Sequence, residues 1–194
     1  MSGMNHLYSV MEECAAESAR IARNAPAELT GATPCAAWDA KTLVNHWVVY
    51  TSHGLEHRAL RTTLPDDLVK HDFTADADWA ERYAAQLERA VAAWGDPAVW
   101  EGEIGVVGSA TPAPDVAAML IAELALHGWD VARTTGQEFR ISEESGTAVL
   151  RIVEEQAEMF RQYEGFAAAV EPPEPASAFA RALALSGRTP HSPA

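Results

Sequence analysis

The sequence Glu123-Leu-Ala-Leu-His127-Gly-Trp-Asp130 lies inside residues 113 to 136, a stretch that is otherwise mostly apolar. If this stretch is helical, Glu123 and His127 lie one turn apart on the same face, with Cβ atoms about 6 Å from each other. A carboxylate and an imidazole on an inward-facing stripe are costly unless each is paired, hydrogen-bonded or bound to a metal ion. The stretch therefore predicts the central helix of the fold and a polar site within it.

The composition predicts a globular protein of ordinary core size. The chain has 194 residues, 48% hydrophobic and 22% charged, with a formal net charge of -14. A surface this acidic repels phosphate backbones and anionic lipids, which argues against nucleic-acid and membrane partners. No apolar run approaches the ~20 residues of a membrane span, and the start of the chain lacks the features of a signal peptide. Cys14 and Cys35 form no Cys-x-x-Cys pair, which argues against a disulfide framework. We expect a cytoplasmic protein.

Helical periodicity covers most of the chain. Apolar residues spaced i, i+3, i+4, i+7 predict long helices over residues 4–24, 40–61, 78–94, 113–136 and 143–164. Asp39 is expected to cap the second of these helices, because its carboxylate can accept from free amides of the first turn. Residues 99–112 fit a short hairpin and a long loop equally well.

The C-terminal part of the chain predicts an appendage. Pro172-Pro-Glu-Pro175 indicates a linker, residues 179–188 a short docked helix, and residues 189–194 a disordered or loosely held end. We expect an all-α bundle with a mixed connection before the central helix. Residues 1–170 should form the bundle, and residues 171–194 a Pro-rich linker and docked tail of the same domain.

Three histidines, His46, His53 and His57, follow one side of the predicted helix 40–61. Residues 46 and 57 are about 16 Å apart along such a helix, so one metal ion could not bind both ends. One of these histidines, with Glu123 and His127, would give a two-histidine, one-carboxylate site drawn from two facing helices. Zinc accepts this ligand set, and three protein ligands leave a fourth position for water or substrate.

The residue types do not decide which metal would bind, or whether a metal binds at all. Nickel, iron and manganese would also fit these ligands. The alternative is a buried hydrogen bond between Glu123 and His127, with His46 on a solvated surface.

Two motifs carry a resemblance to a known family. Thr33-Pro-Cys-Ala-Ala-Trp-Asp-Ala-Lys-Thr-Leu-Val-Asn-His46-Trp-Val and Ala122-Glu-Leu-Ala-Leu-His127-Gly-Trp-Asp-Val-Ala-Arg-Thr-Thr-Gly136 resemble the DinB-like metal-binding proteins. The most similar branch is the N-terminal domain of mycothiol-dependent maleylpyruvate isomerase, whose single-domain members also end like residues 183–188. The resemblance implies a four-helix bundle that holds a divalent metal, zinc above all, through His46, Glu123 and His127.

The same resemblance implies chemistry with a small thiol such as mycothiol. A thiol that coordinates a metal is deprotonated, and the thiolate is the nucleophile. The protein is then expected to act as an S-transferase, or as an isomerase, on an electrophilic substrate. The branch's named isomerase carries a second domain that this chain is too short to contain, so the electrophile stays open.

Further residues are candidates for supporting roles. Asp130 could accept a hydrogen bond from the free ring nitrogen of His127, or instead have a surface or capping role. His53 could act as a base or contact a ligand. Tyr50 could line the pocket or belong to the core. The alternative function is a non-catalytic metal- or small-ligand-binding module whose apolar faces serve dimerisation. A homodimer is compatible with either function.

Overall fold

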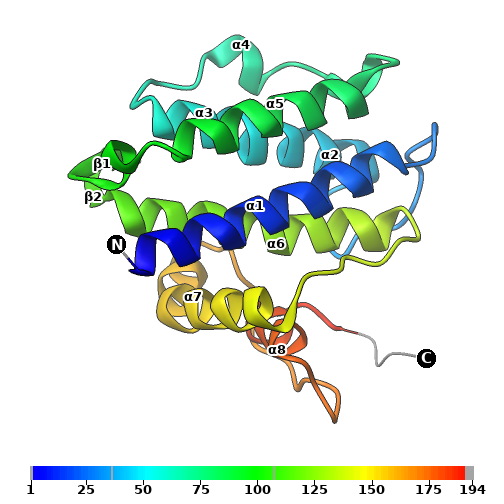
Figure 1. Ribbon diagram of the computed structural model, residues 1–194. Coiled ribbons are helices and arrows are strands. Elements are labelled where there is room, and N and C mark those ends of the chain that lie inside the picture. The colour runs from blue at the N-terminus through cyan, green and yellow to red at the C-terminus, as the bar shows by residue number, and fades with distance from the viewer. Residues whose placement is uncertain (1, 36, 107, 191–194) are drawn as a thin grey trace. The chain divides into compact units, whose positions relative to one another are not determined.

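The computed structural model describes residues 2–35, 37–106 and 108–190, and confirms a mainly helical protein (Figure 1). The chain divides into two compact units, Met1–Arg140 and Ile141–Ala194. The helices and strands of the first unit are α1 (Ser2–Arg23), α2 (Ala40–Val48), α3 (Gly54–Ala59), α4 (Asp66–Val69), α5 (Trp79–Trp94), β1 (Glu103–Val106), β2 (Ser109–Pro112) and α6 (Ala113–Thr134). Those of the second unit are α7 (Glu143–Gln162) and α8 (Ala178–Leu185).

The first unit is a bundle of four helical columns (Figure 1). The helices α2 and α3 form one column, because the π-helical turn Val49–His53 joins them without a break. Helix α1 packs against α5 and α6, and the α2–α3 column packs against the same two helices. The columns bury a core of large apolar side chains that includes Met11, Leu43, Trp47, Leu87, Trp94, Ile121 and Leu124. Burial of these side chains holds the columns together.

The helix ends follow the predicted capping chemistry. The Asp39 carboxylate accepts from the backbone amide of Thr42 at 2.8 Å, which fixes the start of α2. Pro114 stands in the first turn of α6, where its missing amide proton costs no helical hydrogen bond. Gly136, just beyond the end of α6, has a φ of +71°, in the left-handed region that favours glycine. These three positions set the ends of the two helices that carry the candidate site.

The predicted helix 40–61 is present over residues 40–59, but it contains a π-helical turn that the sequence analysis did not anticipate. The amide of Gly54 donates to the carbonyl of Val49, five residues earlier. The hydroxyls of Thr51 and Ser52 donate to the carbonyls of residues 47 and 48, each at 2.6 Å. Such bonds from Ser or Thr to the preceding turn bend helices. The extra residue in the turn changes which side chains beyond it share a face with His46.

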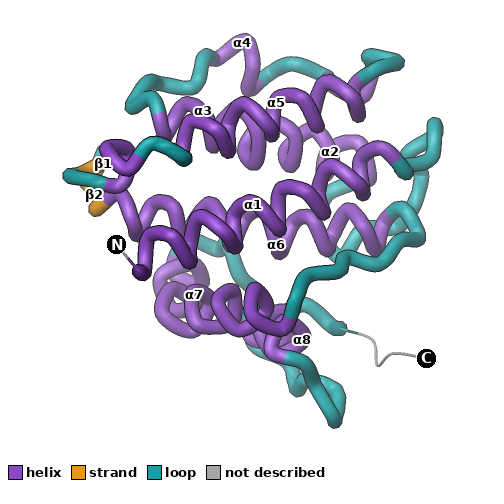
Figure 2. The backbone as a smooth tube through the Cα atoms, viewed as in Figure 1, coloured by secondary structure: helices purple, strands orange, loops and turns teal. Residues whose placement is uncertain are grey.

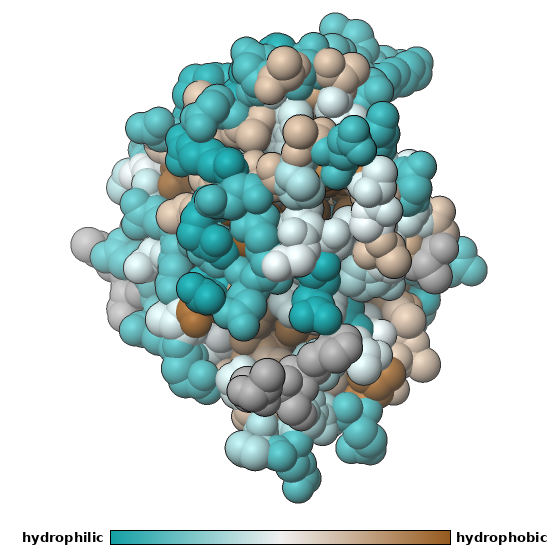
Figure 3. Space-filling model, turned by 90° about the vertical axis from the view of Figure 1, so that its right-hand side faces the viewer, coloured by the Kyte–Doolittle hydropathy of each residue, from teal (hydrophilic) through white to brown (hydrophobic). Residues whose placement is uncertain are grey.

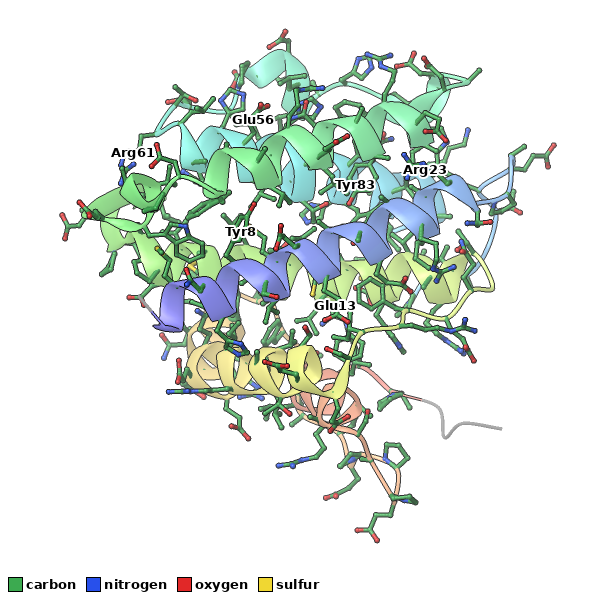
Figure 4. All side chains as sticks on the ribbon, in the orientation of Figure 1. Tyr8, Glu13, Arg23, Glu56, Arg61 and Tyr83 are labelled. Carbon is green, nitrogen blue, oxygen red and sulfur yellow. The ribbon has the colours of Figure 1, made fainter. Side chains whose placement is uncertain are left out.

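Residues 103–106 and 109–112 pair as an antiparallel hairpin (Figure 2), which decides between the two alternatives for residues 99–112. Strand β1 pairs with β2 in a register that sets Ile104 opposite Thr111. The Arg61 guanidinium donates to the carbonyl of Glu101 at 2.5 Å, and Arg58 donates to the carbonyl of Gly105, also at 2.5 Å. Arg61 is labelled beside the hairpin in Figure 4. These bonds attach the hairpin to the end of the α2–α3 column.

The second unit consists of α7, α8 and the Pro-rich segment between them. Ser142 and Ser177 cap the two helices by accepting from amides three residues on, each at 3.1 Å. Helix α8 packs on α7, and the guanidinium of Arg161 donates to the carbonyl of Leu185 at 2.8 Å. The short C-terminal helix that the sequence predicts is thus present, packed on α7. The two compact units divide after Arg140, whereas we expected one bundle over residues 1–170. Helix α7 packs with α8 and belongs to the second unit. Residues 191–194 lie outside the described chain.

The surface is mainly hydrophilic on the face shown in Figure 3, where hydrophobic residues occur singly or in small groups. Scattered apolar residues of this kind are normal on protein surfaces. Among the residues that the structure describes, no helix combines the length and the apolar character that a membrane crossing requires.

Substitution of Gly31 by alanine should destabilise the first unit. A Cβ atom at residue 31 would lie 2.1 Å from the carbonyl oxygen of Thr134, a backbone atom held in α6. Overpacking of this kind costs roughly 1–3 kcal/mol, so the urea midpoint of Gly31→Ala should fall clearly below that of the wild type. Gly3→Ala is the matched control, because nothing lies within 4 Å of its Cβ position. Equal midpoints for the two variants would show that the chain around residue 31 is not held against α6.

Candidate metal centre

The structure brings His46, Glu123 and His127 together across two facing helices. His46 projects from the last turn of α2, and the other two side chains lie one turn apart on α6. Their ligand atoms all lie within 4.8 Å of one another. The Glu123 Oε2 atom is 3.8 Å from His46 Nε2 and 3.5 Å from His127 Nε2. Tetrahedral zinc with bonds near 2.0–2.1 Å separates its ligands by about 3.4 Å, so this arrangement fits the ion with small side-chain movements.

The three side chains are partly open to solvent. Their exposed fractions are 26% for His46, 31% for Glu123 and 14% for His127. A structural zinc site is closed by four protein ligands, whereas a catalytic site keeps one position free. If a metal ion were bound here, three partly exposed ligands would leave one position free, as in the second type.

Asp130 hydrogen-bonds Nδ1 of His127, the ring nitrogen on the side away from Glu123. Its Oδ2 atom lies 3.0 Å from His127 Nδ1, and its side chain is fully buried. A ring whose Nδ1 donates to a carboxylate presents Nε2 as the free acceptor. Because Nε2 faces Glu123, this hydrogen bond directs the ligand atom of His127 toward the proposed metal position, as the sequence analysis expected of Asp130.

The electrostatics of the site favour a charged His127. Burial alone would lower the pKa of this imidazole, but the Glu123 carboxylate and the hydrogen bond to Asp130 outweigh burial and raise the pKa from 6.5 to about 10. Metal binding requires the unprotonated ring, so a metal ion at Nε2 must displace a proton.

Cys35 is a contact of the site that the sequence analysis missed. Its thiol donates to Asp130 Oδ2 at 3.5 Å, so one buried carboxylate oxygen accepts from both Cys35 and His127. The hydroxyl of Thr33 bonds the carbonyls of Cys35 and Trp38, each at 2.7 Å, and so fixes the loop that carries the thiol. Cys35, His127 and Asp130 also form a second group of potential ligands within 4.8 Å, but this group uses the opposite ring nitrogen of His127.

Two aromatic side chains flank His46. The Trp38 ring lies 4.5 Å from the His46 ring and 5.9 Å from the His127 ring, measured between centroids. The Tyr50 ring lies 4.6 Å from that of His46 and is 38% exposed. The structure therefore places Tyr50 beside the site, as predicted, and adds Trp38, which the sequence analysis named only as part of a motif.

His53 and His57 lie elsewhere, although the sequence analysis placed them on one stripe with His46. The His53 ring stacks on Phe73 at 5.4 Å and lines a separate cavity between the α2–α3 column and α5. His57 Nδ1 lies 2.7 Å from the Thr62 hydroxyl. The π-helical turn Val49–His53 accounts for the difference, because its wider winding rotates His53 and the residues after it away from the His46 face. His53 is therefore poorly placed to act as a base at the metal position.

Replacement of Asp130 by asparagine should weaken metal binding without removing any ligand. The amide keeps the size of the side chain but can donate to Nδ1 of His127, which would move the proton to Nε2 and block the ligand atom. Loss of such a supporting hydrogen bond typically costs 10–100-fold in metal affinity, and competition with a chelator measures it. Asp39→Asn, which alters only a helix cap, is the matched control. Equal zinc affinity for Asp130→Asn and wild type would contradict the role of Asp130.

The stability of the metal-free protein should fall as the pH rises from about 6.5 to about 10. The folded state raises the pKa of His127, so protonation of this ring stabilises the fold below 6.5 and ceases to do so above about 10. The urea midpoint, measured with a chelator present, reports this loss. His127→Gln should lack that part of the pH dependence. Parallel curves for the two proteins would rule out the ion pairs of His127 as its source.

No family model, curated protein or solved structure matches this chain. The resemblance to the DinB-like proteins therefore rests on the two motifs around His46 and His127. Function must be inferred from the positions of the side chains themselves.

Proposed function

We propose that this protein binds one divalent metal ion, zinc in preference to nickel, iron or manganese, through His46, Glu123 and His127. The observation that carries the proposal is the approach of three ligand atoms, from two helices, to within 4.8 Å of one another. Two histidines and one carboxylate are a ligand set that zinc accepts. The hydrogen bond from His127 to Asp130 supports the proposal, since ligand histidines usually donate their second ring nitrogen to such a group.

The site is proposed to act on small molecules as a thiol-dependent S-transferase or isomerase of the DinB-like type. A divalent metal held by His46, Glu123 and His127 would supply the acidity that converts a coordinated thiol into a thiolate. The sulfur of a thiol such as mycothiol would bond to an electrophilic carbon, with the thiol proton passing to solvent. In a transferase that acts by substitution, the leaving group would depart with the electron pair of its bond to that carbon, and the new S–C bond would persist. In an isomerase, the sulfur would add to a carbon–carbon double bond whose π electrons move onto a neighbouring carbonyl; after rotation about the former double bond these electrons would return and the S–C bond would break.

The chain's own residues would provide access and orientation for this reaction. The partial exposure of His46 and Glu123 leaves room for a small molecule beside them. Trp38 and Tyr50 flank His46 and offer apolar ring surface to the rest of the thiol or to the electrophile.

One observation favours a non-catalytic alternative. His127 lies between Glu123, 3.5 Å away, and Asp130, 3.0 Å away, and its raised pKa makes this a favourable ionic cluster without a metal. A protein of this kind would be a small-ligand-binding or dimerisation module.

Metal content and thiol transfer together decide between the two functions. The wild type, exposed to zinc and then freed of excess, should hold about one metal per chain by elemental mass spectrometry, and His46→Ala almost none. His57→Ala is the matched control, because this histidine lies on the same helical column and bonds only Thr62 among the described contacts. It should retain the metal.

The wild type, His46→Ala and His57→Ala are then tested in a transfer assay with mycothiol and 1-chloro-2,4-dinitrobenzene, a general electrophile. Turnover by wild type and His57→Ala, but not by His46→Ala, is the expected result. Metal retention by His46→Ala would refute the ligand assignment. Metal binding without turnover across a panel of thiols and electrophiles would favour the binding module.

A further inference from the structure

A cavity of about 180 Å³ lies in the first unit between the α2–α3 column and α5, apart from the candidate metal centre. We call it the His53 cavity; its buried walls are formed by Val48, Phe73, Tyr83 and Gln86, with His53 and Trp79 half-buried at its side. A cavity of about 150 Å³ can hold benzene. The His53 cavity therefore has room for one aromatic ring with small substituents, and its walls are largely aromatic.

The imidazole of His53 lines this cavity. Its ring stacks on Phe73 at an angle of 26°, and no residue in the described part of the chain hydrogen-bonds to it. Burial lowers the pKa of His53, which keeps the ring neutral near pH 7. A neutral imidazole offers one donor and one acceptor. Both groups are available to a molecule bound in the cavity.

The opening of the cavity carries two arginines. Arg82 and Arg89 are exposed residues of α5, and they line the cavity together with a single carboxylate, Asp76. Arg82 donates to Asp76 at 2.8 Å, while Arg89 bonds the Gln86 side chain. Each guanidinium has five N–H donors, so these contacts leave donors for a ligand. Asp78 also lies 3.9 Å from Arg82, and Glu56 lies 3.9 Å from Arg89, so a bound carboxylate would use the guanidinium donors that these side chains leave unfilled.

Hydrogen bonds to neighbouring side chains hold two wall residues of the cavity, Tyr83 and Gln86, in place. The Tyr83 hydroxyl lies 2.7 Å from the Thr51 hydroxyl, in a buried contact between α5 and the π-helical turn. Gln86 donates to Glu56 at 2.5 Å, and Arg89 is only loosely paired with Glu56, at 3.9 Å. Figure 4 labels Glu56 and Tyr83 on these facing elements. Because the side chains that line the cavity are already held in place, they lose little conformational freedom when a ligand binds.

The π-helical turn Val49–His53 determines where His53 lies. In a regular helix His53 would share a face with His46, seven residues earlier, yet it stacks on Phe73 instead. Single π-helical turns within α-helices frequently occur at functional sites. Here the turn assigns one histidine to the metal centre and another to the His53 cavity.

We propose that the His53 cavity binds a single-ring aromatic carboxylate that carries a hydroxyl group on its ring. The ring would lie among Phe73, Trp79 and Tyr83, where aromatic contacts favour a planar ligand. The ring hydroxyl would hydrogen-bond to His53. The carboxylate would bind Arg82 and Arg89, whose planar forks match its two oxygens.

Calorimetric titration of the full-length, zinc-free protein with 4-hydroxybenzoate tests this proposal. We expect saturable binding at one site per chain. Benzoate, which lacks the hydroxyl, should bind roughly fivefold more weakly, the effect of one neutral hydrogen bond. The uncharged 4-hydroxybenzamide should bind at least roughly tenfold more weakly, because it cannot form the charged pair with arginine.

Substitutions assign each part of the ligand to its partner. His53→Phe keeps a ring against Phe73 but removes both nitrogens, so it should weaken binding of 4-hydroxybenzoate and leave benzoate affinity unchanged. Arg89→Gln should weaken both ligands. Arg151→Gln is the matched control, because this exposed arginine of α7 pairs only with Glu155 among the described contacts. Circular dichroism establishes that each variant is folded.

Three results would overturn the proposal: no saturable binding to the wild type, equal affinity for the three ligands, or equal binding by wild type, His53→Phe and Arg89→Gln. Loss of binding in His46→Ala would also overturn it, because the carboxylate would then occupy the metal centre. The titration needs no metal, so its outcome is independent of the metal-content measurement.

Discussion

The position of His127 between two carboxylates is the constraint on which the candidate site depends. Helix α6 runs through the bundle with a largely apolar surface, and an imidazole there is tolerated because Glu123 and Asp130 contact its two nitrogens. Asp130 in turn is fully buried and accepts from Cys35 as well. The loop that carries Cys35 is therefore tied to the same cluster. One ring thus connects the central helix, the loop before α2 and the proposed metal position.

The π-helical turn is the second feature that organises function. It divides the histidines of one helical column between two environments. His46 lies beside Trp38 and Tyr50, whereas His53 lies beside Phe73. His46 faces the Glu123 carboxylate and solvent, whereas His53 faces aromatic walls and a cavity. The first environment suits metal coordination, and the second suits recognition of a small organic molecule.

Regular periodicity explains why much of the fold could be predicted from the sequence. The helices over residues 4–24, 78–94 and 113–136 and the Asp39 cap are confirmed, because local spacing and capping chemistry determine them. The convergence of Glu123 and His127 follows from the same spacing. The place of His53 could not be predicted from a 3.6-residue period, since the π-helical turn depends on hydroxyl bonds at residues 51 and 52. The contact between Cys35 and Asp130 depends on tertiary packing.

X-ray absorption spectroscopy of the zinc-loaded protein is the most direct test of metal binding by His46, Glu123 and His127. The spectrum should show only nitrogen and oxygen ligands near 2.0–2.2 Å, with the outer scattering of about two imidazole rings. A sulfur ligand near 2.3 Å would instead identify the overlapping group of Cys35, His127 and Asp130 as the metal site. Failure of the protein to retain any zinc would contradict a metal centre of either kind.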